Sequence, residues 1–172
     1  MSPGEIHQDH PFSTPPELRD PVRRFRGRLA APVTLVTSGT AEHRTGLTVS
    51  SLMVAEGSPA YLHLLVGRAT ELWDQIQDTG SFVVHILSHR DRSLADRFAM
   101  VQPSPGGLFA GLEVVDTDFG PELTVIESRA YCRYAGYFET TYHALVHGVV
   151  EAVVLGDLKH PLQYFRGEYF YG

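Results

Sequence analysis

Length, composition and charge limit what this chain can be. Its 172 residues, 43% of them hydrophobic, suffice for one core, so we expect one domain. The formal charge is −6, from 14 basic and 20 acidic residues, and this balance disfavours nucleic acid and anionic lipid as partners. Cys132 is the one cysteine, which excludes an intrachain disulfide and a cysteine-rich zinc site. No signal-peptide pattern or bilayer-length apolar run of about 20 residues occurs, so we expect a cytoplasmic protein without a membrane segment.

The N-terminal region divides into an arm and a helix. Residues 1–16 contain four prolines and predict a flexible arm, which leaves residues 17–172 as the folded domain. Asp20 and the proline after it then predict the start of a short amphipathic helix that runs to Ala30. Four arginines follow one face of this helix. We interpret them as a solvated face, with an anion site as the alternative.

Beyond Pro32 the chain changes to short β-branched and apolar runs, which are typical of strands. One helix is predicted between the cap Thr70 and Gly80, and another from the capping-box pair Ser88 and Asp91 to the proline at 103. Single helices among six or so strands predict a mainly β domain, with a mostly antiparallel sheet closed or partly closed into a barrel. The predicted strands are 33–37, 47–54, 60–66, 82–87, 128–134 and 144–155.

The segment 46–51, Gly-Leu-Thr-Val-Ser-Ser, carries the strongest local signal for a ligand. The two-residue period of a strand places Thr48 and Ser50 on one face, so two hydroxyls line one wall. Small polar side chains and main-chain amides leave room for the polar parts of a flavin. Thr and Ser on an ordinary solvent-facing strand would give the same pattern, so the segment alone does not decide between the two.

Further segments follow this one in a specific order. Residues 60–66 form a strand that leads into Gly-Arg-Ala-Thr at 67–70, and Gly80 to Leu87 reads Gly-x-Phe-x-Val-x-x-Leu. His143 precedes Gly148, and a Pro-Leu-Gln-Tyr segment stands at 161–164. In this order and spacing, residues 20–170 resemble the flavin reductase family.

The resemblance implies an FMN-binding split β-barrel that works as a homodimer. It also implies FMN or FAD as cofactor, in a groove near the subunit interface, and NAD(P)H as electron donor. The positions that correspond to flavin-binding residues are Thr48, Val49, Ser50, Ser51, Gly67, Arg68, Thr70 and His85.

The chemistry of the phosphate-binding positions agrees with this assignment. Arg68 offers charge-assisted bonds to phosphate, and Thr70 stands at a predicted helix start, where N–H groups favour an anion. A solvated surface arginine is the alternative for Arg68. His85 stands where relatives often carry Asn, and either a core histidine or a hydrogen bond to the flavin explains it.

His143 is the candidate catalytic residue. The resemblance places it where nicotinamide stacks on the flavin, and hydride transfer needs alignment rather than a general base. Relatives have Gly-Asp before this histidine, whereas this chain has Thr141 and Tyr142, so the nicotinamide pocket is expected to differ.

The resemblance predicts an NAD(P)H-dependent flavin reductase whose reduced flavin supplies a monooxygenase partner. Two alternatives stay open. One is a carrier or sensor that binds a flavin or haem without NAD(P)H turnover, and the other is a diverged flavin enzyme acting on an aromatic metabolite.

No metal site is predicted. His143 and His147 have the spacing of a helical zinc pair, but the surrounding apolar residues predict a strand. In a strand the two rings attach roughly 13 Å apart, which is too far to share one ion.

Overall fold

The computed structural model describes residues 20–170, so the predicted arm over residues 1–16 lies outside the described residues. Strands are the commonest element in the described residues, which also contain three short helices and one 3₁₀ turn. The elements are α1 (Pro21–Arg26), β1 (Ala31–Pro32), β2 (Thr34–Gly39), β3 (Arg44–Val49), β4 (Leu52–Ala55), β5 (Tyr61–Gly67), α2 (Glu71–Thr79), β6 (Ser81–Ile86), η2 (His89–Asp91), α3 (Arg92–Phe98), β7 (Val115–Thr117), β8 (Gly120–Glu122), β9 (Ser128–Glu139), β10 (His143–Val154), β11 (Gln163–Phe165) and β12 (Glu168–Phe170).

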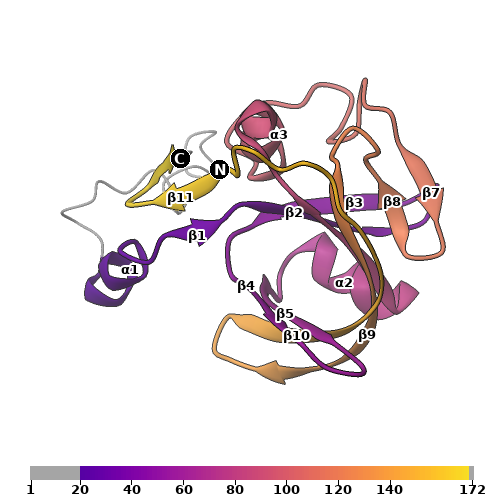
Figure 1. Ribbon diagram of the computed structural model, residues 1–172, viewed down its shortest axis with the longest axis horizontal. Helices are drawn as coiled ribbons and strands as arrows, with labels where there is room; N and C mark the ends of the chain where they lie inside the picture. Colours follow the sequence, from indigo (N-terminus) through magenta and orange to yellow (C-terminus); the bar gives the residue numbers. More distant parts are fainter. Residues whose placement is uncertain (1–19, 171–172) are drawn as a thin grey trace, which may run out of the picture.

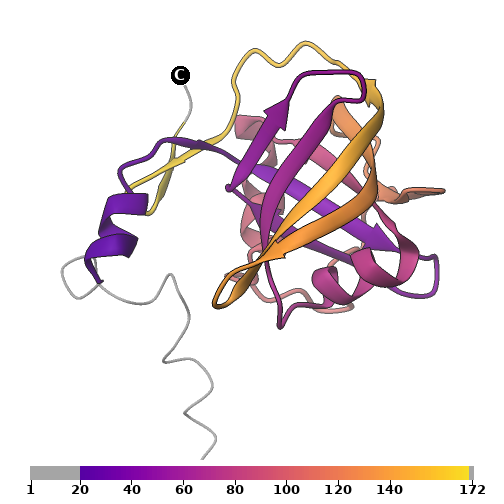
Figure 2. The same cartoon turned by 90° about the horizontal axis from the view of Figure 1, so that it is seen from below.

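The main sheet has seven antiparallel strands in the order β3-β2-β6-β9-β10-β5-β4. Its two edge strands, β3 and β4, are consecutive in the chain and separated only by Ser50 and Ser51. The sheet therefore curls until its edges approach, as Figures 1 and 2 show. At this junction the Leu65 N–H donates to the carbonyl of Ser51 at 3.2 Å. The result is a split barrel, which confirms the predicted fold class.

Two cores lie on the two faces of the curled sheet. The inner core joins alternate residues of the strands to Leu72, Trp73 and Ile76 of α2, which lies within the curl (Figure 1). The outer core lies between β2, the α3 residues Ala95 and Phe98, and the segments around 108–126 and 162–169. Because apolar side chains on both sheet faces are covered, the period-two pattern is blurred in β2, whose six residues are all buried.

The predicted strand 47–54 is wrong as a single element. It is broken at Ser50 and Ser51 because the chain must pass there from one edge of the sheet to the other. Helices α1 and α3 are also shorter than predicted. α1 ends at Arg26 rather than at Ala30, and α3 ends at Phe98, after which Met100 adopts a left-handed φ of 57°.

The sequence patterns did not predict five short strands, of which β7 and β8 pair with each other. β1, β11 and β12 form a small sheet that stands off from the barrel together with α1 (Figure 2). Val22 and Phe25 of α1 and Leu29 just after it are 77%, 66% and 58% exposed. None of the helices in residues 20–170 has the length and apolarity that a membrane crossing needs.

Candidate functional site

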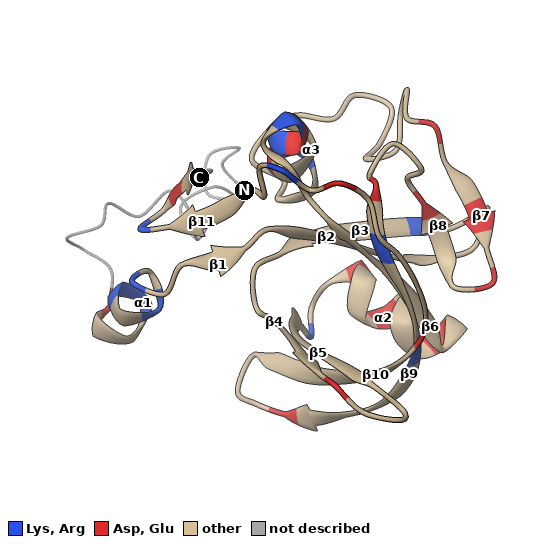
Figure 3. Ribbon diagram, viewed as in Figure 1, with Lys and Arg blue, Asp and Glu red and all other residues tan. Residues whose placement is uncertain are grey.

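The junction between the sheet edges exposes two hydroxyls with weak local partners. The Ser51 hydroxyl donates to the carbonyl of Leu65 at 3.3 Å, and the Ser50 hydroxyl accepts from the Arg26 guanidinium at 3.4 Å. Both distances are at the long end for hydrogen bonds, so a ligand can compete for these groups. Arg26 is one of the four arginines for which the sequence left an anion site as the alternative to a solvated face, and α1 carries this basic patch in Figure 3.

The end of β5 continues from this junction into a tight turn. The Thr70 hydroxyl donates to the carbonyl of Gly67 at 2.7 Å and accepts from the Trp73 N–H at 3.3 Å, which caps α2. The side chain of Thr70 is therefore occupied in shaping the turn. What it offers a ligand is the N-terminus of α2, where N–H groups and the helix dipole favour an anion.

Arg68 projects from this turn and forms an ion pair with Glu139, at the end of β9. Their side chains are 41% and 60% exposed. Such exposed pairs contribute about 0–1 kcal/mol, so a phosphate dianion can displace Glu139 from the guanidinium. The main-chain N–H of Arg68 donates to the carbonyl of Tyr142 at 3.1 Å, which fastens the turn to the β9–β10 hairpin.

His143 begins β10 and stands directly opposite Gly67 on β5. Its backbone closes the hairpin through the Thr140 hydroxyl, which donates to its carbonyl at 2.7 Å, while its ring is exposed. The structure therefore brings His143 beside the Gly67–Thr70 turn, although the two segments are more than 70 residues apart.

These residues share one face of the barrel. Along β5 and β10, buried residues alternate with more accessible ones, so Leu65, Gly67, His143 and Leu145 face outward at the same end. Ser51 continues this face, since the register of β4 on β5 places it opposite Leu65. The outer surface at this end therefore joins the hydroxyl junction to the Arg68 turn.

Three of the predicted flavin positions have side chains that the fold itself engages, so contact with a flavin through their main-chain amides stays a prediction. The Thr48 hydroxyl donates to the carbonyl of Ala95 at 2.7 Å, which attaches α3 to β3. Val49 belongs to the inner core and is 4% exposed. The expected wall shared by the hydroxyls of Thr48 and Ser50 therefore does not form, because Thr48 contacts α3 whereas Ser50 contacts Arg26 of α1.

His85 is the third of these positions, and it is fully buried. The Leu123 N–H donates to its Nε2 at 3.1 Å, so Nδ1 carries the proton and donates to the carbonyl of Leu35 at 3.1 Å. Burial lowers the pKa of His85 to about 4. Of the two interpretations of this residue, the geometry supports the core histidine, because both ring nitrogens have backbone partners.

The remaining positions fit a flavin nucleotide. Gly67 presents no side chain, and a Cβ added there would meet only the Thr70 methyl group, at 3.3 Å, so a flat ring can approach the backbone. Leu65 is 37% exposed and supplies apolar surface, while Ser50 and Ser51 supply hydroxyls. Arg68 supplies a cation for the phosphate, which FMN and FAD both carry.

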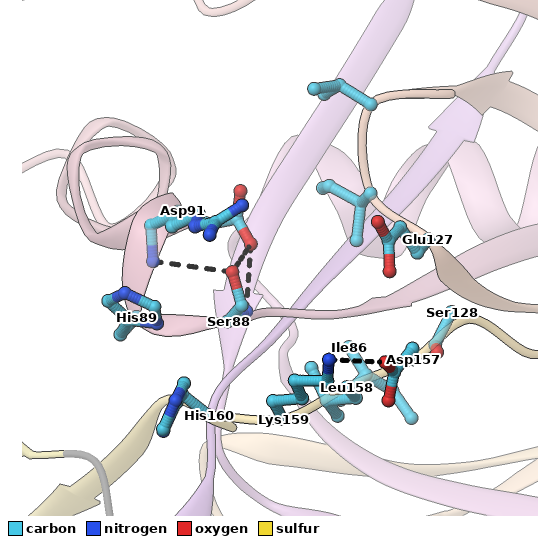
Figure 4. Close-up of a pocket in the computed structure, with 13 residues that line it drawn as sticks. Ile86, Ser88, His89, Asp91, Glu127, Ser128, Asp157, Leu158, Lys159 and His160 are labelled. Carbon is cyan, nitrogen blue, oxygen red and sulfur yellow. Dashed lines mark hydrogen bonds and ion pairs between the residues drawn. The ribbon is translucent and has the colours of Figure 1, made fainter.

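One cavity of the described residues lies elsewhere, and none of the predicted flavin residues lines it. It has a volume of about 570 Å³ and lies between the end of β6, η2 and residues 125–128 and 157–160 (Figure 4). Its charged lining includes Arg90 and Glu127, and an ion pair of 3.0 Å joins Lys159 to Asp157. We assign no function to this cavity.

Comparison with known proteins decides the family. Residues 26–172 match the family model described as flavin reductase like domain, which covers most of the chain. The chain belongs to the flavin reductase family. This confirms the resemblance drawn from the ordered motifs.

Several members of the flavin reductase family are similar over most of their length. The reductase component of 4-hydroxyphenylacetate 3-monooxygenase from Thermus thermophilus is 26% identical over 152 residues, which cover 88% of this chain and 95% of that protein. An FMN reductase (NADH), RutF, from Methylorubrum extorquens is 25% identical over 147 residues, covering 86% of this chain and 72% of that protein.

Solved structures of flavin reductases share the fold. Flavin reductase PheA2 superposes with a TM-score of 0.80 at 21% identity, over 89% of this chain and 98% of that chain. The NADH:FAD oxidoreductase SgcE6 of Streptomyces globisporus, in complex with NAD and FAD fragments, gives a TM-score of 0.79 at 21% identity, over 91% and 94% of the two chains. These likenesses concern the fold.

Proposed function

We propose that this protein is an NAD(P)H:flavin oxidoreductase that binds FMN or FAD. The observation that carries the proposal is the outer face where Ser51, Gly67 and His143 come together beside Arg68. Family membership supports a flavin-binding role for this face, since relatives are named as FMN reductase (NADH) and as the reductase component of a monooxygenase. A flavin bound here supplies a ring that accepts a hydride from the nicotinamide.

The residues of the chain bind and align rather than exchange protons. Arg68 and the start of α2 hold the phosphate, and Arg26 adds a second positive charge at the Ser50 side of the junction. The hydroxyls of Ser50 and Ser51 bond the polar parts of the flavin. His143 borders the place where the nicotinamide is aligned, and alignment of the two rings is the main catalytic requirement.

We further propose a monooxygenase partner that receives the reduced flavin, because similar proteins are named as reductase components of such enzymes. The two proteins need no stable complex if the reduced flavin diffuses between them. The same proposal includes a cytoplasmic protein whose residues 17–172 form the one folded domain.

Turnover of NADH with free flavin tests this function directly. With NADH as donor, the purified protein should catalyse the reduction of FMN, FAD or both. The fall in NADH absorbance with time measures this turnover. His143→Gln should lower kcat about tenfold while leaving flavin affinity within a factor of about three, because the ring borders the nicotinamide rather than the phosphate. Tight flavin binding without any NAD(P)H oxidation would contradict the reductase and favour the carrier.

We also propose that the protein is a homodimer. The apolar face of α1 is exposed in the single chain, and Phe25 alone is 66% exposed, so a second copy would remove this surface from water. Analytical ultracentrifugation should give twice the chain mass, and Phe25→Ser should weaken the dimer about tenfold or more. Val125→Ser is the matched control, because Val125 is 64% exposed on another segment. A wild-type protein that sediments as a monomer at micromolar concentration would refute the dimer.

A further inference from the structure

His63 on β5 and His147 on β10 are direct cross-strand partners on the outer face of the barrel. Their Nδ1 atoms lie 2.7 Å apart, and the rings meet edge to face with centroids 4.9 Å apart. Both side chains are half-buried. The ring of Tyr61 lies almost parallel to that of His63, with an interplanar angle of 9° and centroids 6.3 Å apart.

The separation of these nitrogens is close to that of two ligands on one metal ion. A metal bonds imidazole nitrogen at about 2.0–2.1 Å, so two such ligands at a right angle are about 2.9 Å apart and at a tetrahedral angle about 3.3 Å. The observed 2.7 Å is nearest to the right angle, which is the geometry that Cu²⁺ prefers. Small rotations of the two rings open the remaining few tenths of an ångström.

The histidine pair has one further cross-strand neighbour on each side, and we call these four residues across β4, β5, β10 and β9 the row. Met53 on β4 stands directly opposite His63 and is 61% exposed, so a thioether is available from the third strand. Gly136 on β9 stands opposite His147, and a Cβ added there would meet nothing within 4 Å. The row therefore presents a soft ligand on one side of the histidine pair and open space on the other.

We propose that His63, His147 and Met53 form a copper-binding site. Two imidazoles suit copper in both oxidation states, and the thioether adds preference for Cu⁺. The residues that the structure describes contain no group of three or more His, Cys, Asp and Glu side chains around this pair, so water completes the coordination and the site stays open. Binding requires both Nδ1 atoms unprotonated, so the ring that now donates carries its proton on Nε2 instead.

The copper site adjoins the proposed flavin site on the same outer face. His63 and Met53 stand two residues from Leu65 and Ser51 along their strands, about 6.6 Å at 3.3 Å per residue, and His63 is about 13 Å from Gly67. The sequence argument against a zinc pair of His143 and His147 stands, because β10 is continuous from His143 to Val154. The partner of His147 is the histidine across the ladder rather than the one along the strand.

Titration of the flavin-free full chain with Cu²⁺, followed by electron paramagnetic resonance and calorimetry, tests the proposal. One equivalent should bind with an axial signal that shows two nitrogen ligands. His63→Gln and His147→Gln should each lower the affinity at least tenfold, and the double variant should lose little more than either alone, because each single change already breaks the chelate. Met53→Leu should lower the affinity for Cu⁺, measured by competition with a chromophoric chelator, more than that for Cu²⁺.

Two controls separate this pair from the other histidines. His43→Gln removes an exposed ring. His160→Gln removes one member of a second close pair of histidine rings, His89 and His160, whose centroids are 5.2 Å apart. Neither change should alter the affinity. The proposal is overturned if the His63 and His147 variants bind Cu²⁺ as tightly as the wild type, or if the loss occurs in the His160 variant instead. Unchanged Cu⁺ affinity in Met53→Leu would remove Met53 from the site.

Discussion

Replacing Arg68 with Gln should raise the KM for flavin about tenfold and leave kcat nearly unchanged. A hydrogen bond to a charged group contributes about 1.5–3 kcal/mol, and 1.4 kcal/mol corresponds to a factor of ten. The lower end applies here, because the Arg68 side chain is 41% exposed and water and salt weaken its field. Steady-state kinetics with NADH, and flavin fluorescence quenching for the dissociation constant, measure the effect.

Two further variants give this prediction its specificity. Glu139→Gln removes the carboxylate that pairs with Arg68, so it should leave flavin affinity equal to or tighter than that of the wild type. Arg90→Gln removes an exposed arginine at the large cavity beside η2 and should change neither constant. If Arg90→Gln weakens flavin binding and Arg68→Gln does not, the nucleotide lies in that cavity and the phosphate assignment at Arg68 is wrong.

Acid should destabilise this protein through His85. Its pKa is about 4 in the folded chain against an ordinary value of 6.5, so between these two values the unfolded chain binds more protons. The stabilisation is therefore complete above about pH 6.5 and is lost as the pH falls towards 4. Linkage gives a loss of about 2 kcal/mol in the free energy of unfolding between pH 7.5 and pH 5 from this residue. Urea unfolding of the flavin-free protein at the two pH values measures it.

A comparison with His85→Asn isolates the contribution. Asn does not titrate but is shorter than His, so the variant should be less stable at pH 7.5 by about 1–3 kcal/mol, since a buried backbone group loses its partner. It should also lose about 2 kcal/mol less than the wild type on going to pH 5. His43→Asn, at an exposed loop position, should follow the wild type. Equal pH dependence in the wild type and His85→Asn would show that His85 is not the acid-sensitive group.

The sequence by itself determined the family, the class of fold and most of the elements. The order of the motifs indicated the family, and local signals predicted the helices and strands. The cap at Thr70, the left-handed Gly80 that ends α2, and the capping box of Ser88 and Asp91 all form as predicted. These features depend on a few neighbouring residues and on local backbone geometry, so a sequence pattern contains them. The β1, β11 and β12 sheet lacked such a pattern because its strands have only two or three residues.

Only the tertiary structure decided which polar residues are available to a ligand. Thr48 and His85 looked like ligand-binding residues, yet a carbonyl of α3 and the N–H of Leu123 engage them, and these partners lie 47 and 38 residues away in the chain. The pairing of His63 with His147, 84 residues apart, is equally invisible to any local pattern. Strand register and the closure of the sheet at Ser50 and Ser51 set these contacts. Both arise from packing of the whole core, so no spacing along the sequence encodes them.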